Sequence, residues 1–184
     1  LLSTPLALDN DHKNWQPVKT SGTFEDFIIY EDNAILDGKA GYKIYHLFKN
    51  SDNSYIFIHR GFVERNKIKN NLPKVEVPEG IKNLEGKVLK RTNNAFIQNI
   101  QESDSRIIQE FDLSYLKERH SSLKNKEIYE YLFNLQAENE MKFSTIEKPV
   151  NMSSSKHIGY AIQWFGLCAA LIILTIYAYR RKDG

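Results

Sequence analysis

The stretch IGYAIQWFGLCAALIILTIYAY, residues 158–179, decides the architecture because it carries no charged side chain over 22 consecutive positions. A helix of this length, rising about 1.5 Å per residue, would be about 33 Å long, and a membrane hydrocarbon core measures roughly 30 Å. Aromatic residues near both ends are typical of membrane–water interfaces. The stretch therefore predicts a transmembrane helix over 158–179, with a buried helix of a soluble core as the alternative.

The charges that flank this stretch predict its direction. The tail 180–184 holds three of the 25 basic residues and one of the 23 acidic ones, so the rest of the chain is neutral. Basic residues stay on the cytoplasmic or matrix side of a membrane. We therefore expect an extracytoplasmic domain, in the periplasm with the helix in the bacterial inner membrane. The alternative is the mitochondrial inner membrane.

Residues 10–150 form the predicted domain and are dominated by strand patterns. Strands are expected at 23–31, 41–48, 54–64, 83–92, 94–100 and 128–137. Gly61 inside the third strand indicates a bulge or a close approach. A short helix is expected over 112–119 with Asp112 as its N-cap. The predicted fold class is α+β, mainly β, followed by a joint at 151–157 and the transmembrane helix.

Composition and motifs exclude several function classes. The only cysteine, Cys168, excludes a disulfide within the chain and a zinc site built from cysteines. A net charge of +2 argues against nucleic acid as a partner. The sequence has no serine-hydrolase elbow, phosphate-binding glycine loop, dinucleotide fingerprint or HExxH pair. The residues therefore favour a protein that is not an enzyme. The lipid bilayer is the partner that the sequence itself indicates.

His157 precedes the predicted transmembrane helix, where its imidazole would lie at the membrane edge. On a helix, His157, Tyr160 and Trp164 share one stripe with Ala161. A flat macrocycle such as haem requires one nitrogen ligand, flanking aromatic rings and an apolar wall. Two interpretations stay open: these side chains contact a haem, with His157 on its iron, or His157 only marks the membrane boundary.

A second stripe of the same helix consists of Gly159, Gln163 and Gly166. Small residues with a single amide suit close packing against another transmembrane helix. Exposure of this stripe to lipid is the alternative.

The other candidate residues lie in the predicted domain. Arg60 is suited to bidentate hydrogen bonds with a carboxylate, either in an internal salt bridge or on a ligand. His46 and His59 fall in predicted strands and are expected to be hydrogen-bonded structural residues. His12 and His120 stand among charged residues and are expected to be solvated.

The segment KHIGYAIQWFG, residues 156–166, resembles a signature of the surfeit locus protein 1 family of cytochrome c oxidase assembly factors. The family pattern is approximately H-x-x-Y-A-x-Q-W-F, and all six defined positions match. This block is the specific part of the resemblance.

Three upstream segments support the resemblance, which covers most of residues 14–179. IFIHRGFVE, residues 56–64, is similar to a strand that ends in R-G-W-V, with Phe62 in place of the tryptophan. WQPVKTSGTF, residues 15–24, is similar to the opening "W-x-x-V, then G-x-F", and GKAGY, residues 38–42, to a "G-x-x-G-Y" turn. The family's arginine near that turn has no evident counterpart here.

The resemblance implies a non-enzymatic accessory protein that helps mature subunit I of the oxidase. It would receive or stabilise haem a delivered by haem a synthase. His157 would bind the haem iron, with Tyr160, Trp164 and Phe165 near the porphyrin, and Gly159, Gln163, Phe165 and Gly166 are candidates for packing on a partner. The alternative is a scaffold that binds oxidase subunits without haem. Family members usually begin with a membrane helix, so residues 1–9 would be a remnant that follows one.

Overall fold

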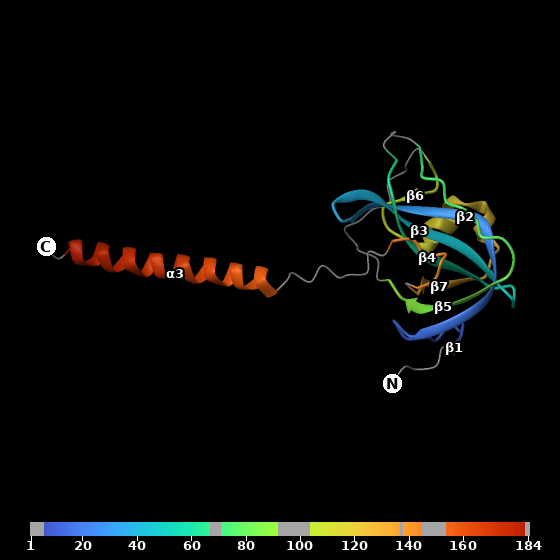
Figure 1. The fold of residues 1–184 in the computed structure, drawn as a ribbon, viewed down its shortest axis with the longest axis horizontal. Coiled ribbons are helices and arrows are strands. Elements are labelled where there is room, and N and C mark those ends of the chain that lie inside the picture. Colours follow the sequence, from blue (N-terminus) through green and yellow to red (C-terminus); the bar gives the residue numbers. More distant parts are fainter. Residues whose placement is uncertain (1–5, 67–70, 92–103, 137, 145–153, 183–184) are drawn as a thin grey trace. The chain divides into compact units, whose positions relative to one another are not determined.

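The computed structural model describes residues 6–66, 71–91, 104–136, 138–144 and 154–182 (Figure 1). The chain divides into two compact units, Leu1–Ile146 and Glu147–Gly184. The first unit is rich in strands, and the second contains the helix α3 (Ser154–Lys182). This arrangement confirms the predicted mainly β, mixed domain followed by an apolar helix.

In the described part of the first unit, six strands come first along the chain, and two short helices then precede the last strand. The elements are β1 (Leu6–Ala7), β2 (Pro17–Leu36), β3 (Lys39–Asn50), β4 (Tyr55–Glu64), β5 (Lys82–Leu89), β6 (Ile107–Ile108), α1 (Leu113–Arg119), α2 (Ser121–Lys124) and β7 (Ile128–Leu135). The sheet runs β2–β3–β4–β7–β5, and β5 pairs with β2 again. Five strands therefore close into a barrel, in which only the β4–β7 pair is parallel.

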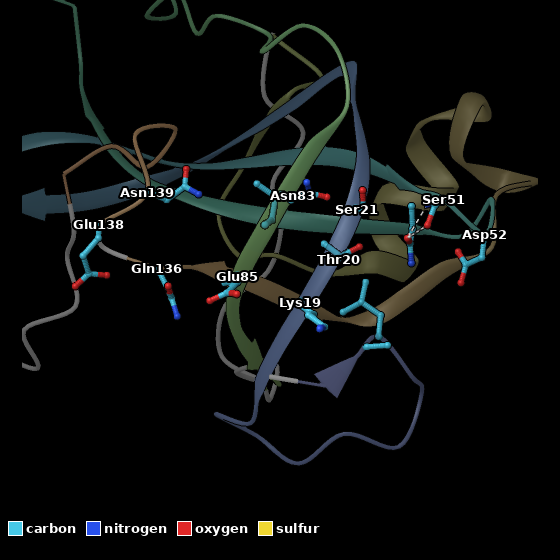
Figure 2. Close-up of a pocket in the computed structure, with 14 residues that line it drawn as sticks. Lys19, Thr20, Ser21, Ser51, Asp52, Asn83, Glu85, Gln136, Glu138 and Asn139 are labelled. Atoms are coloured by element: carbon cyan, nitrogen blue, oxygen red, sulfur yellow. Dashed lines mark hydrogen bonds between the residues drawn. The ribbon is translucent and has the colours of Figure 1, made fainter. Parts of the chain in front are cut away.

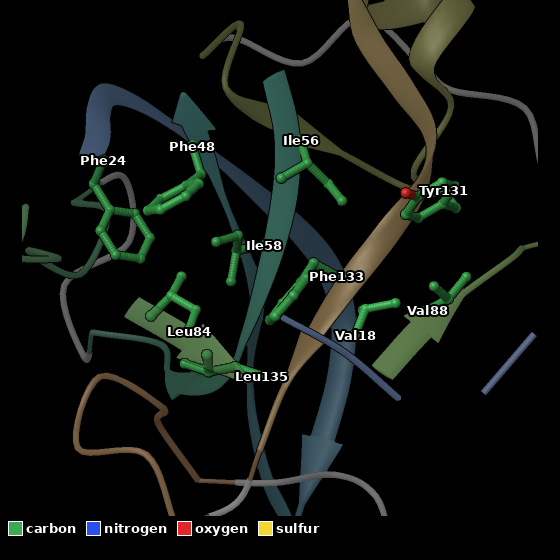
Figure 3. Packing of buried hydrophobic residues seen from close by; sticks show 10 residues of the cluster. All are labelled: Val18, Phe24, Phe48, Ile56, Ile58, Leu84, Val88, Tyr131, Phe133 and Leu135. Atoms are coloured by element: carbon green, nitrogen blue, oxygen red, sulfur yellow. The ribbon is translucent and has the colours of Figure 1, made fainter. Parts of the chain in front are cut away.

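The barrel interior is filled by apolar side chains from all five strands. Figure 3 shows this cluster: Val18, Phe24, Phe48, Ile56, Ile58, Leu84, Val88, Tyr131, Phe133 and Leu135. Because side chains alternate along a strand, Phe57 and Leu132 point outward. There they pack with Leu116 of α1 and Leu123 of α2 in a second cluster. The two helices thus cover one outer face of the barrel.

A β-bulge interrupts β4 where the sequence predicts one. Ile44 of β3 pairs with Gly61 and Tyr45 pairs with His59, which leaves Arg60 as the extra residue of β4. Gly61 has φ +105°, and a Cβ there would lie 2.7 Å from the carbonyl oxygen of Phe143. Any other residue would therefore strain the backbone and clash at this position.

Most predicted elements of the domain are confirmed. Strands β3, β4, β5 and β7 match their predictions closely, and the Asp112 carboxylate accepts hydrogen bonds from the first backbone amides of α1. Strand β2 is much longer than the predicted 23–31, because two register shifts interrupt its alternation. The strand predicted over 94–100 lies outside the described residues.

Helix α3 extends beyond the predicted span at both ends. It begins at Ser154, so the last four residues of the predicted joint are helical. Residues Ile158–Arg181 form a helix long and apolar enough to cross a membrane, with its side chains exposed throughout. The alternative of a buried soluble helix receives no support from packing within the described residues.

The barrel cluster predicts a large loss of stability when a large side chain at its centre is truncated. Phe133 is fully buried, and we expect Phe133→Ala to lower the free energy of unfolding by about 3–5 kcal/mol, from lost burial plus a residual cavity. Ile81→Ala removes an exposed side chain and should change it by less than about 0.5 kcal/mol. Urea unfolding of the full chain, followed by circular dichroism, measures both; equal losses would contradict this assignment of the core.

Candidate functional site

The predicted site at the start of the membrane helix lies on regular helical backbone. His157, Tyr160 and Trp164 all belong to α3. At about 100° per residue, positions 157, 160 and 164 fall on one side of the helix. By the same geometry, Gly159, Gln163 and Gly166 fall on a second side, about 120° around the helix from the first. The helix therefore separates the two predicted stripes into two faces.

Two aromatic side chains of the first face are exposed. The exposed fractions are 53% for Tyr160 and 67% for Trp164, and Phe165 beside them is also exposed. Gly159 and Gly166 have no other heavy atoms within 4 Å of the positions that a Cβ would occupy. One face thus offers aromatic rings, and the other allows close approach of a neighbouring helix.

Arg60 is held inside the domain by the bulge and closes one end of the barrel. Its Nε donates to the carbonyl oxygen of Met141 at 2.9 Å, and its Nη1 donates to the carbonyl oxygen of Glu76 at 2.9 Å. The guanidinium lies over the rings of Phe24 and Phe143, at 5.4 and 4.5 Å from their centroids. These contacts tie β4 to two segments that are distant in the sequence.

The expected carboxylate partner of Arg60 is replaced by carbonyl oxygens. Within the described residues, no acidic side chain forms an ion pair with Arg60. Its side chain is only 4% exposed, and this burial lowers the pKa of Arg60 to about 10, although the charge of Glu76 opposes the shift. The guanidinium stays protonated at neutral pH, stabilised by backbone dipoles and aromatic faces.

The histidines of the domain divide differently from the prediction. His46 is structural, as predicted: its Nε2 lies 2.7 Å from the carbonyl oxygen of Glu25, and Arg60 donates to its Nδ1 at 3.1 Å. Burial lowers the pKa of His46 to about 4, so the ring is neutral at physiological pH. His59 contacts Asn134 and is likewise structural.

The expectation that His12 and His120 are solvated is wrong for His12 and incomplete for His120. His12 is buried, with its Nε2 2.8 Å from the carbonyl oxygen of Ala7, and its ring meets Tyr131 edge to face. His120 is half-buried against Phe27. Both stand beside charges in the sequence, but the loops that hold them pack their rings against aromatic side chains.

A buried ionic cluster around Glu31 was not anticipated from the sequence. Glu31 is 3% exposed and accepts hydrogen bonds from Lys43 at 2.6 Å, Tyr45 at 3.1 Å, Arg91 at 2.5 Å and the backbone amide of Phe111 at 3.1 Å. Burial alone would raise the pKa of this carboxyl, but the two cations hold it below its ordinary value. The sequence contains a pattern that indicates this burial. Glu31 follows Phe27 and Ile29 at a spacing of two, so it lies on the same apolar face of the strand.

A polar hollow of about 800 Å³ lies along the β2–β5 pair (Figure 2). Cross-strand neighbours line it, with Lys19 opposite Glu85 and Ser21 opposite Asn83. None of the residues predicted to be functional is among the described residues that line it. The hollow therefore adds no support to the site at the membrane helix.

Comparison with known proteins shows that the domain and the start of α3 belong to one known family. A family model described as the SURF1 family matches residues 1–169, which include the barrel, the Arg60 bulge and the first half of α3. No curated protein matches the chain significantly.

The Glu31 cluster predicts a stability that depends on pH. Because the folded pKa of Glu31 lies below its ordinary value of 4.5, its contribution is present above about pH 4.5 and is lost as the pH falls through the folded pKa. Glu31→Gln leaves the half-buried Lys43 and Arg91 without their carboxylate and should cost about 1.5–3 kcal/mol at pH 7. The difference between wild type and variant in urea unfolding should shrink in acid.

A matched control is Glu64→Gln, which removes an exposed ion pair with Lys39. It should cost less than about 1 kcal/mol. A Glu31→Gln variant as stable as the Glu64→Gln variant would show that the buried cluster does not stabilise the fold.

Proposed function

Because the chain belongs to the SURF1 family, which is associated with cytochrome c oxidase assembly, we propose that it is an assembly factor that receives or stabilises haem a for subunit I. Family members are assembly factors rather than enzymes, and the proposal needs no catalytic group. Haem a is the cargo here, and haem a synthase and subunit I are the proposed donor and recipient.

The observation that carries the haem proposal is the composition of one face of α3. Tyr160 and Trp164 present exposed aromatic rings on the side of the helix where the backbone places His157. The four equatorial iron ligands of a haem belong to its macrocycle, so the protein has to supply only axial nitrogen and an apolar surface. The residues present fit that need: His157 would bind the iron, and the two rings would cover the porphyrin.

The second face of α3, which carries the small residues, supports the role proposed for packing. Gly159, Gln163 and Gly166 let a neighbouring helix approach closely, with the Gln163 amide as a hydrogen-bond donor in lipid. Phe165 lies between the two faces. Docking through this face leaves His157 and its aromatic neighbours free for cargo, so partner and haem do not compete for the same side chains.

We place the barrel domain outside the cytoplasm or matrix, with the basic tail inside. Arg180, Arg181 and Lys182 follow the apolar helix directly, and such residues favour the inner side. The proposed location is the bacterial inner membrane with the domain in the periplasm. A mitochondrial inner membrane with the domain in the intermembrane space satisfies the same charges.

The proposed orientation predicts opposite labelling of two introduced cysteines. In a Cys168→Ser background, Glu118→Cys on the exposed side of α1 should react with a membrane-impermeant maleimide in intact spheroplasts or mitoplasts. Gly184→Cys in the basic tail should react only after lysis. The reverse pattern would contradict the orientation.

The proposed haem site predicts that one histidine variant loses bound haem. The full chain purified from cells that make haem a should carry haem, and His157→Ala should lose most of it because no axial nitrogen remains. His120→Ala, which changes a half-buried histidine of the domain, should keep it. The absorption spectrum per unit of protein measures all three.

The alternative of a haem-free scaffold is distinguished in the same preparations. Crosslinking of the wild type to subunit I without any haem in the spectrum would favour the scaffold. Equal haem in the wild type and in His157→Ala would contradict the ligand assignment but leave haem binding in place.

A further inference from the structure

An irregular segment, residues 71–80, crosses the end of the barrel that Arg60 closes; we call it the strap. It contains neither helix nor strand and leads into β5 (Figure 1). Two buried side chains of the domain hold the strap by hydrogen bonds. The Tyr30 hydroxyl donates to the carbonyl oxygen of Pro73 at 3.1 Å, and Arg60 donates to the carbonyl oxygen of Glu76. The strap is therefore a fixed part of the domain surface.

The strap has the burial pattern of an extended strand that lacks a neighbour. Val75 is buried and Val77 half-buried, whereas Lys74 and Glu76 are exposed, and this alternation has the period of two of a strand. Within the described residues, the backbone amides of 74–77 and 79 donate no hydrogen bond. A row of free amide donors on an extended segment is a template for pairing with another chain.

The strap also forms one wall of a groove of about 1000 Å³. The opposite wall consists of Glu140, Met141 and Phe143, and Arg60 lines the groove between the walls. Two of the three guanidinium nitrogens of Arg60 are used in the contacts described above. Its Nη2 makes no hydrogen bond within the described residues. This nitrogen can donate to a carbonyl oxygen placed in the groove.

The rim of the groove is negatively charged. Asp26, Glu76, Glu79 and Glu140 are exposed at its edge, against Lys74 as the one exposed cation among the described lining residues. None of the four acids forms an ion pair within the described residues. The rim therefore attracts basic side chains and repels phosphates and carboxylates.

We propose that this groove binds an extended, basic segment of a partner protein, which adds as a strand alongside the strap. Because successive amides of an extended chain point to opposite edges, every second free strap amide donates to a carbonyl oxygen of the segment, as in other complexes formed by strand addition. Arg60 Nη2 donates to a further carbonyl oxygen. Lysine or arginine side chains of the segment reach the acidic rim, while its apolar side chains meet Met141 and Phe143.

The test uses the full chain in an uncharged detergent and two synthetic, end-capped peptides. The probe is Lys-Val-Lys-Val-Lys-Val with a fluorophore, and the control peptide is Glu-Val-Glu-Val-Glu-Val. Anisotropy titration should show binding of the basic peptide that weakens with added salt, and much weaker binding of the acidic peptide. Equal affinity for the two peptides would overturn the proposal.

Two triple variants of identical charge change separate the groove from the overall charge of the domain. Glu76→Gln, Glu79→Gln and Glu140→Gln together should weaken the basic peptide by about tenfold or more, since three rim charges are lost. The control combines Glu85→Gln, Glu118→Gln and Glu138→Gln, which are exposed acids outside the groove, and should weaken it by less than about twofold. Equal weakening by both triples would overturn the site.

Hydrogen exchange tests the mode of binding directly. In the free protein the amides of 74–77 and 79 should exchange rapidly, and the basic peptide should protect alternate ones among them. Protection confined to other segments would contradict strand addition at the strap. Neither result depends on haem, so the groove and the proposed haem role stand or fall separately.

Discussion

The closure of the barrel depends on β2 pairing with two different strands in succession. Its first six residues pair with β5 and most of the rest with β3, and Gly22 pairs with both Lys82 and Asn50. A Cβ on Gly22 would lie 2.0 Å from the backbone oxygen of Lys49, so the chain can turn this corner only with glycine. Without the corner, β5 and β2 would leave two unpaired edges, and the interior cluster would lose its enclosure.

Closure also determines where ligand groups can act. The interior is occupied by apolar side chains from all five barrel strands, so most polar groups lie at the ends and on the outer faces of the barrel. The Arg60 bulge lies at one such end, because an extra residue in β4 breaks the ladder beside Phe143. The strap covers the same end without completing a sheet, which leaves its amide donors unused beside a charged rim.

The regular elements were predictable, and the long-range contacts were not. Alternating apolar residues were sufficient for β3, β4 and β7, and the N-cap carboxylate was sufficient for α1. The full length of β2 was hidden by its register shifts, which break the period of two. The position of His12 could not be foreseen, since its contact with Tyr131 joins residues more than a hundred positions apart.

The candidate site shows the same division between local and distant information. The two faces of α3 follow from helical spacing alone, and the structure adds that Tyr160, Trp164 and Phe165 are exposed. The role of Arg60 depended on segments far along the chain, because carbonyl oxygens of Glu76 and Met141 hold its guanidinium where a carboxylate was expected.

That difference gives Arg60 a second use. A carboxylate partner would neutralise Arg60 and could occupy all its nitrogens, whereas backbone acceptors leave the charge in place and one nitrogen unused. The charge of Glu76 offsets part of the desolvation of this cation, so the guanidinium stays protonated in the groove. The same arrangement favours a bound segment that brings carbonyl oxygens to the centre of the groove and positive charge to its edge. The backbone acceptors that hold Arg60 in the fold thus also leave it one hydrogen-bond donor for an incoming chain.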